Sequence, residues 1–252
     1  MSLQVVAIRD AREAPIPLSQ PGLSSLFDRQ PLERFDAGSA VFWEGDDAAH
    51  LFQVTAGILR AVRLLSDGRR IIVGFLRPGD LLGVSLKDRY LYTVEAITPV
   101  ALRRLSRRRF EEEIRRQPQL RDQLFSRLCD EMTAAQDQTV LLSRRSADEK
   151  VANFLLMMSR DEFGNCTRIV DIPMTRLDMA DYLGMTIETV SRTITKLTNS
   201  GIITATGRRS MMVLKMDALR SLADGDNGET GCCQRVRDMP PHRDGLTVWK
   251  SA

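Results

Sequence analysis

The segment Met174–Gly201, MTRLDMADYLGMTIETVSRTITKLTNSG, constrains the fold of this chain more than any other. Apolar residues recur at helical spacing on both sides of Gly184. Because glycine adopts positive φ at low cost, Gly184 allows a sharp turn between two helices. Thr186 is placed to cap the second helix, and Glu188 lies near its positive end. We therefore predict two helices packed about a tight turn.

The two predicted helices should pack through their apolar faces. The first should bury Leu177, Ala180 and Leu183. Ala180 is small, which allows a crossing helix to come close. The second should bury Ile187, Val190, Ile194 and Leu197, at spacings of 3, 4 and 3.

The residues left outward near the start of the second helix have the chemistry that reads DNA. Arginine donates to guanine O6 and N7, a carboxylate accepts from cytosine N4, and serine pairs with several bases. We predict that Glu188, Ser191 and Arg192 contact base edges, and that Thr186 and Thr189 contact phosphates. The alternative is an i,i+4 salt bridge between Glu188 and Arg192 on a solvated face, worth about 0.2–0.5 kcal/mol.

Two short apolar stretches, Ile202–Thr204 and Met211–Leu214, follow this pair of helices. They predict two strands, and the turn between them contains Gly207, Arg208 and Arg209. A basic turn of this kind forms a wing beside the helices. Arg208 and Arg209 should contact phosphates, which positions the motif on DNA without reading its sequence.

From about residue 32 to residue 106 the chain changes to short apolar stretches separated by turn signals. Seven or eight short strands at this spacing predict an all-β sandwich or jelly roll. Asp67-Gly68, between two apolar pairs, is a clear hairpin signal. The candidate strands are Ala40–Trp43, Leu51–Thr55, Gly57–Leu64, Arg70–Phe75, Leu81–Val84, Tyr92–Ala96 and Ala101–Leu105.

A helical pattern begins after residue 107, with a short helix over Arg108–Gln117 and a longer one over Pro118–Arg144. Apolar and small residues of the longer helix form a narrow seam with polar flanks, which favours a partner helix of the same shape. We predict a symmetric homodimer; the alternative is that the seam packs on the β-domain of its own chain. The seam residues are Phe125, Leu128, Met132, Ala135, Thr139 and Leu142.

These patterns predict an α+β protein in five segments. They are an irregular arm (1–30), an all-β sandwich or jelly-roll domain (31–116), a dimerisation helix (117–145), a winged helix-turn-helix domain (146–222) and a disordered tail (223–252). The last domain should begin with a helix from Ala147 to about Arg160. The tail is rich in Gly, Asp, Pro and Arg and has little apolar periodicity.

The chain resembles the Crp/Fnr family of bacterial regulators, on its Fnr/FixK side, over residues 30–222. The match rests on Tyr182–Leu197, Gly207–Leu214, Asp67–Ser85 and Tyr92–Pro99, together with the dimer-type helix. Glu188, Ser191 and Arg192 form the E-x-x-S-R arrangement of Fnr-like members. The resemblance implies that residues 31–116 form a β-roll sensor-like domain of the cyclic-nucleotide-binding type, followed by the dimerisation helix and the winged helix-turn-helix. It also implies a homodimeric activator on a palindromic TTGA(T/C)-type site in double-stranded DNA. RNA polymerase is then an expected partner, and genes of microaerobic, anaerobic or nitrogen metabolism are expected targets.

The sensor half departs from the liganded members of that family. Cyclic-nucleotide-binding relatives hold the phosphate with Gly-Glu and Arg-Ser or Arg-Thr pairs, whereas this chain has Gly79-Asp80 and Arg89-Tyr90. The Fnr iron–sulfur cluster needs N-terminal cysteines, and none precedes Cys129. We expect no cofactor and no bound metal, as in FixK-like members without a known effector. The alternative is a sensor gated by a small molecule in an apolar pocket lined from Leu81–Val84 and Tyr90–Val94.

The composition excludes several other classes of protein. A net charge of +3 is small, and no apolar run approaches the roughly 20 residues of a membrane helix. The N-terminus lacks the pattern of a secretory signal, so we expect a cytoplasmic protein without membrane contact. With two histidines, His50 and His242, the chain shows neither a His/Glu metal set nor a nucleophile–base pair, so we expect no enzyme. Cys129, Cys166 and the pair Cys232-Cys233 should be free thiols.

Overall fold

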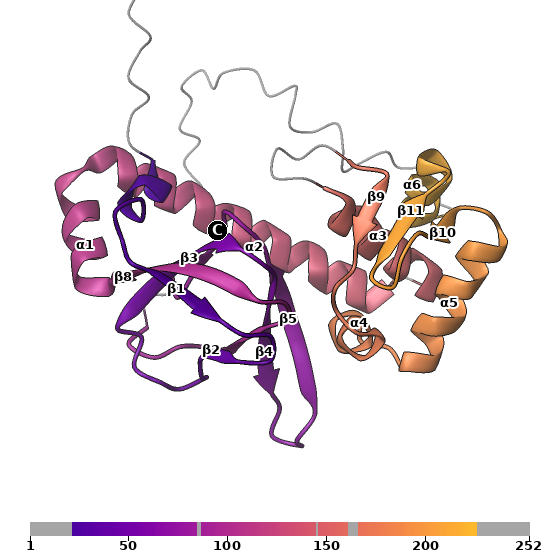
Figure 1. Ribbon diagram of the computed structural model, residues 1–252, viewed down its shortest axis with the longest axis horizontal. Coiled ribbons are helices and arrows are strands. Elements are labelled where there is room, and N and C mark those ends of the chain that lie inside the picture. Colours follow the sequence, from indigo (N-terminus) through magenta and orange to yellow (C-terminus); the bar gives the residue numbers. More distant parts are fainter. Residues whose placement is uncertain (1–21, 85–86, 145, 161–165, 226–252) are drawn as a thin grey trace, which may run out of the picture.

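The computed structural model describes residues 22–84, 87–144, 146–160 and 166–225. A β-rich N-terminal domain is followed by a long helix, which runs along that domain to a smaller C-terminal domain (Figure 1). The predicted α+β class, with its order of β-roll, long helix and helix-turn-helix, is confirmed. Most of the predicted arm (1–30) and tail (223–252), with His242, Cys232 and Cys233, lies outside the described residues.

The N-terminal domain is a sandwich of two four-stranded antiparallel sheets. The strand orders are β1-β8-β3-β6 and β2-β7-β4-β5. The Asp67-Gly68 hairpin forms as predicted, with Gly68 at φ 81° and its amide bonded to the Leu65 carbonyl. The strands are β1 (Leu32–Phe35), β2 (Ala40–Phe42), β3 (His50–Ala56), β4 (Leu59–Leu64), β5 (Arg70–Leu76), β6 (Leu81–Leu82), β7 (Thr93–Ala96) and β8 (Val100–Ser106).

The sequence patterns did not predict β1, and they predicted β6 as Leu81–Val84, two residues longer than observed. Residues of β1 alternate between exposed and half-buried, because it is an edge strand that pairs only with β8 in this sheet. Strand β6 ends at Leu82, because Gly83 at φ 75° turns the chain away from the sheet.

Aromatic side chains fill the space between the two sheets. The rings of Phe42 and Tyr90 are stacked with centroids 3.7 Å apart, and Phe52 stacks on Phe42 at 5.9 Å. The Tyr90 hydroxyl donates to the His50 carbonyl at 2.8 Å. Val94 and Leu102 are fully buried in the same core. The interior of the sandwich is therefore packed with the chain's own side chains.

Two helices cover one end and one side of the sandwich. Helix α1 (Arg107–Arg116) begins where the Ser106 hydroxyl accepts the Arg109 amide, and α2 (Pro118–Arg144) has the bounds that the sequence predicts. Part of the predicted irregular arm is ordered, which corrects that prediction. Leu23–Leu26 form a 3-10 helix (η1), and Phe27 is fully buried in one core with Leu120, which compensates the entropic cost of ordering this segment.

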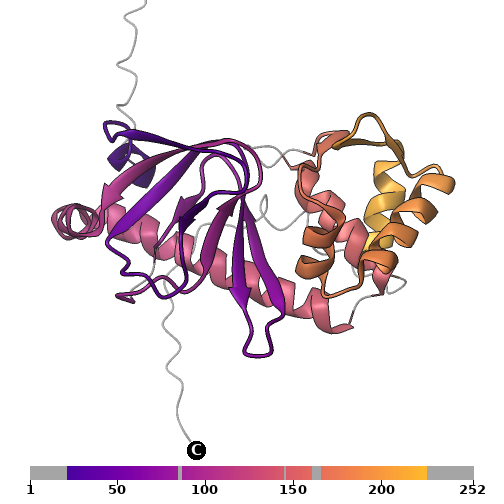
Figure 2. The same ribbon diagram turned by 60° about the horizontal axis from the view of Figure 1, so that its bottom comes forward.

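The C-terminal domain packs four helices against a small three-stranded sheet. Figure 2 shows this domain beside the β-rich domain. Its strand order is β10-β11-β9, antiparallel throughout. Strand β9 has three residues and was not predicted, because so short a stretch shows no alternation. The elements are α3 (Ala147–Ser159), β9 (Ile169–Asp171), α4 (Arg176–Leu183), α5 (Ile187–Asn199), β10 (Ile203–Ala205), β11 (Ser210–Val213) and α6 (Met216–Asp224).

Candidate nucleic-acid interface

The turn between α4 and α5 forms as the sequence predicts. Gly184 has φ 60° and ψ 44°, and its amide donates to the Ala180 carbonyl, which ends α4. The Thr186 hydroxyl accepts the Thr189 amide at 3.2 Å and so caps α5. At the start of α4, the Thr175 hydroxyl and the Asp178 carboxylate form a capping box that the sequence reading did not use. Both helices of the motif therefore have defined starts.

Most of the predicted buried faces are correct, but two residues are not. Ala180, Leu183, Val190, Ile194 and Leu197 are buried, whereas Leu177 and Ile187 are 46% and 40% exposed. Helix α4 is covered on two sides, by α5 and by β5, so Leu177 lies on the remaining open side. Ile187 is the first residue of α5 and lies beyond the core, which begins at Val190.

The outward face of α5 carries the predicted base-reading residues. Glu188, Ser191 and Arg192 are all exposed. An open hollow on this face is lined by Ser191 and Arg192 and continues along Thr195, Lys196, Asn199 and Ser200. Thr195 and Lys196 were missed by the sequence reading, although each lies four residues beyond a predicted contact and so on the same face.

The Glu188 carboxylate is held in its charged form. Hydrogen bonds from its own backbone amide and from the Thr186 hydroxyl, together with the Arg192 charge, lower its pKa. Among the ion pairs of the described residues none joins Glu188 to Arg192, whereas Lys196 pairs with Asp148 of α3. The alternative of an i,i+4 salt bridge is thus absent, and both side chains are available to a ligand at the start of the helix.

The predicted wing is a hairpin of β10 and β11. The Thr206 amide donates to the Ser210 carbonyl at 3.1 Å and closes the turn that contains Arg208 and Arg209. Both arginines are exposed, and the Arg209 carbonyl accepts the Ile172 amide, which ties the turn to the segment after β9. The wing therefore offers two cations from an anchored turn.

The predicted seam of α2 is largely uncovered. Phe125 and Met132 are 68% and 63% exposed, and Ala135 and Thr139 are exposed as well. Leu142 is 38% exposed, and Leu128 is half-buried. The β-domain of the same chain leaves most of this face uncovered and approaches it only at Leu128, so the alternative that the whole seam packs within one chain is wrong. A role of the seam in dimerisation stays a prediction.

The loops that resemble a phosphate clamp are occupied by the chain itself. Arg89 donates to the Gly45 carbonyl at 2.7 Å and lies 3.8 Å from Asp47. The Asp80 carboxylate accepts the Arg77 amide at 2.8 Å and lies 3.6 Å from the Arg127 guanidinium of α2. Tyr90 follows Arg89 in place of the serine or threonine of a phosphate clamp, and its ring stacks on Phe42 in the aromatic core.

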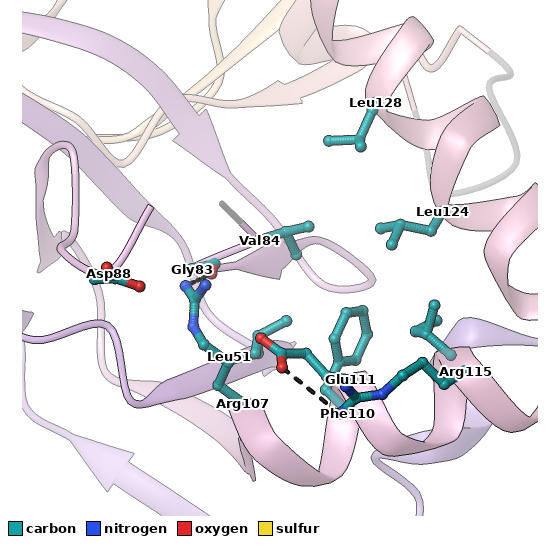
Figure 3. A pocket seen from close by; sticks show the side chains of 11 residues that line it. Leu51, Gly83, Val84, Asp88, Arg107, Phe110, Glu111, Arg115, Leu124 and Leu128 are labelled. Atoms are coloured by element: carbon teal, nitrogen blue, oxygen red, sulfur yellow. Dashed lines mark hydrogen bonds and ion pairs between the residues drawn. The ribbon is translucent and has the colours of Figure 1, made fainter. Parts of the chain in front are cut away.

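A cavity of about 300 Å³ lies between α1, α2 and the segment after β6 (Figure 3). Leu124 and Leu128 of α2 face Val84 and Phe110 across it. Arg115 and Glu111 form a 3.9 Å ion pair at one side. Gly83 and Val84 belong to the predicted pocket, but Tyr90–Val94 do not line this cavity. The predicted lining is correct only in part, because the Tyr90 ring packs inside the sandwich.

Cys129 and Cys166 are free thiols, as expected. In the described ranges, no helix combines the length and apolar character needed to cross a membrane, and no three His, Cys, Asp or Glu side chains are grouped to hold a metal ion.

Comparisons with known proteins agree with this geometry. The profile of the cyclic nucleotide-binding domain matches residues 32–117, and that of the Crp-like helix-turn-helix domain matches residues 149–222. The nitrogen fixation regulation protein FixK of Bradyrhizobium diazoefficiens is 44% identical over 67% of this chain and 72% of its own length. The transcriptional activator protein FnrL of Cereibacter sphaeroides is 34% identical over 78% and 82%.

Among solved structures, FixK2 from Bradyrhizobium japonicum is similar with a TM-score of 0.72 and 33% identity, over 77% of this chain and 96% of that one. A match to both domains in this order, at such identity and over most of each relative, identifies the group. The chain belongs to the Crp/Fnr family of DNA-binding transcription regulators, on its FixK-like branch.

Proposed function

We propose that this protein activates transcription by binding a palindromic TTGA-type site as a symmetric homodimer. The observation that carries the proposal is the start of α5, where exposed Glu188, Ser191 and Arg192 share the outward face of a helix that the Gly184 turn anchors. Such a helix start is the part of a helix-turn-helix that enters the major groove. Relatives named as activators support this direction of regulation.

The side chains divide into those that read bases and those that hold phosphates. Arg192 would donate to guanine, the ionised Glu188 would accept from cytosine N4, and Ser191 would pair beside them. We add Ile187, because its exposed side chain at the first residue of α5 suits the methyl group of thymine. Phosphates would be contacted by side chains that flank the base-reading residues of α5, namely Thr186, Thr189, Arg208 and Arg209.

The dimer follows from the exposed seam of α2. A palindromic site demands a two-fold protein, and both helix-turn-helix domains must lie at the same end of the dimer, so the two α2 helices would run parallel. RNA polymerase is the partner expected of an activator. We propose no enzymatic activity, genes of microaerobic, anaerobic or nitrogen metabolism as targets, and the cytoplasm as the place where the protein meets DNA.

Selection from random DNA tests the proposal. Purified full-length protein should enrich inverted repeats of TTGA(T/C), because each subunit reads one half-site with the same side chains. The bound DNA is recovered over several rounds and sequenced. Enrichment of single, unpaired half-sites would contradict the dimer, and the absence of any enriched sequence would contradict sequence-specific binding.

The cavity between α1 and α2 favours a second candidate, the same regulator gated by a small molecule. Half-buried Leu128 belongs both to the cavity wall and to the predicted seam, so an occupant would act directly on the dimer helix. Its wall is mostly apolar, which suits an uncharged or amphipathic molecule.

We expect operator affinity to survive exhaustive dialysis and to be unchanged by saturating cyclic AMP. The reason is that the aromatic core fills the sandwich and that Arg89 is engaged by the Gly45 carbonyl and Asp47. Fluorescence anisotropy with a labelled operator measures the affinity of the dialysed protein and its affinity in the presence of cyclic AMP. Loss of affinity on dialysis, restored by the small-molecule fraction of a cell extract, would favour the gated sensor instead.

A further inference from the structure

The β4–β5 hairpin of the sandwich reaches the first helix of the DNA-binding motif through charged side chains. Arg60 of β4 contacts the Asp178 carboxylate of α4 at 2.7 Å. Arg70 of β5 contacts the same carboxylate at 2.9 Å and Asp181 at 2.7 Å. Glu95 of β7 holds Arg60 from the other side at 2.7 Å. We call these five residues the interdomain ion cluster.

Asp178 is the centre of the cluster, and its side chain is 1% exposed. Burial by itself would raise its pKa, but hydrogen bonds from the Thr175 amide and hydroxyl, with the charges of Arg60 and Arg70, bring the pKa below its usual value. A buried carboxylate is tolerated only where such partners compensate its lost hydration. The Asp178 carboxylate also caps α4 by accepting the Thr175 amide, so its position is fixed relative to the helix. The contacts of Arg60 and Arg70 with this carboxylate therefore restrain α4 itself.

Apolar contacts extend the same junction. Val62 and Ile72 of the hairpin belong to one core with the helices of the C-terminal domain. Phe75 of β5 lies 5.2 Å, between ring centroids, from Tyr182 of α4. Arg77 donates to the Met157 carbonyl at the end of α3. The hairpin therefore meets the DNA-binding domain over a packed surface, with the ion cluster where that surface touches α4.

Helix α4 transmits this restraint to the recognition helix and to the dimer helix. The Gly184 turn and the shared core join α4 to α5, so the two helices form one packed unit. Near the same C-terminal end of α4, the Gln138 side chain of α2 donates to the Tyr182 carbonyl at 3.1 Å. Helix α4 is thus held between the hairpin and the helix that carries the predicted seam.

We propose that Arg60 and Arg70 are positioning residues for DNA binding, which fix the orientation of α5 relative to α2 and so set the spacing between half-sites that the dimer accepts. The inference rests on the proposed dimeric function. In a two-fold dimer the recognition helices must enter major grooves about one helical turn apart, roughly 34–36 Å. A recognition helix free to swivel would still read its half-site but would tolerate other separations.

The double variant Arg60→Met, Arg70→Met tests this in the full-length protein. Operators carry the selected palindrome with the original central spacer, or with one or two base pairs added or removed. One base pair rotates a half-site by roughly 35° about the DNA axis, so the wild type should lose about 10-fold or more in affinity per step. The variant should bind the original operator about 10-fold more weakly and distinguish the spacers by less than about 3-fold.

Two further variants separate positioning from a loss of fold. Arg63→Met removes a β4 arginine that pairs at 3.3 Å with Glu44 of the same domain, and it should keep the wild-type spacer profile. Arg60→Lys, Arg70→Lys retains the charges and should keep the same optimal spacer. If the methionine double variant does not fold, the single Arg70→Met, in which Arg60 still neutralises Asp178, is measured on the same operators.

A purely structural role would lower affinity by the same factor on every spacer, since only the fraction of folded protein would change. A uniform loss of affinity on every spacer would overturn the inference. So would a methionine variant that binds every spacer with the wild-type affinity. Tighter binding by the variant would overturn it too, because the cluster would then restrain DNA binding. A wild type without any preferred spacer would instead contradict the proposed dimeric function.

Discussion

Met132→Glu is expected to abolish dimerisation and DNA binding together. Met132 is 63% exposed and lies in the middle of the seam, so in a parallel pair of α2 helices the two copies would face each other. Two carboxylates would then be buried without partners, which costs about 3–5 kcal/mol and weakens the dimer by 100-fold or more. Sedimentation measures the monomer–dimer equilibrium, and operator binding is measured on the same samples.

Val140→Glu is the matched control, because Val140 is also an exposed apolar residue of α2, at 53%, but lies outside the seam. It should leave both equilibria unchanged. Leu128 is less suitable for this test, since it also lines the cavity between α1 and α2. A Met132→Glu protein that remains a dimer and binds its operator normally would show that the subunits meet through another surface.

Arg192→Ala is expected to lower affinity by about 1–3 kcal/mol, or about 5- to 150-fold, for each half-site, and to remove the preference at one base pair in each half-site. The physical reason is that Arg192 lies exposed one turn into α5, beside Glu188 and Ser191, and that a guanine loses its two donors when the guanidinium is removed. The measurement is a binding titration against a panel of single-base operator changes.

Arg208→Ala provides the contrast, because a wing arginine should contact phosphate only. It should weaken all sequences alike and lower the slope of log affinity against log salt by about two units if each of the two subunits loses one phosphate contact. Titrations at two salt concentrations separate the two behaviours. Should Arg192→Ala lose affinity equally on every sequence, Arg192 would be a phosphate contact.

Elements that depend on neighbours a few residues away were predictable from the sequence. Gly184 and Thr186 mark the turn and the cap of α5, because each acts on amides within its own segment. Helix α2 and the Asp67-Gly68 hairpin follow for the same reason, from helical spacing and from turn chemistry. The order of β-roll, long helix and winged helix-turn-helix followed from these local patterns.

Which faces are covered was decided only by the tertiary structure. Leu177 and Ile187 have the spacing of buried residues, yet both are exposed, because α4 and α5 pack against other elements on other sides. The ordered Phe27 within the predicted arm is another case, since its partner Leu120 is remote in the sequence. Spacing shows that a helix has an apolar side, but not what lies against it.

The interdomain ion cluster shows the same limit most clearly. In the sequence Asp178 is an ordinary third residue of a helix, and Arg60 and Arg70 are polar residues of a hairpin, 118 and 108 positions away. Only the docking of the sandwich onto α4 buries the carboxylate and makes the arginines its partners. Local chemistry predicted which side chains lie on the outward face of α5, and long-range packing decided how that helix is held, because contacts between distant segments leave no periodic trace in the sequence.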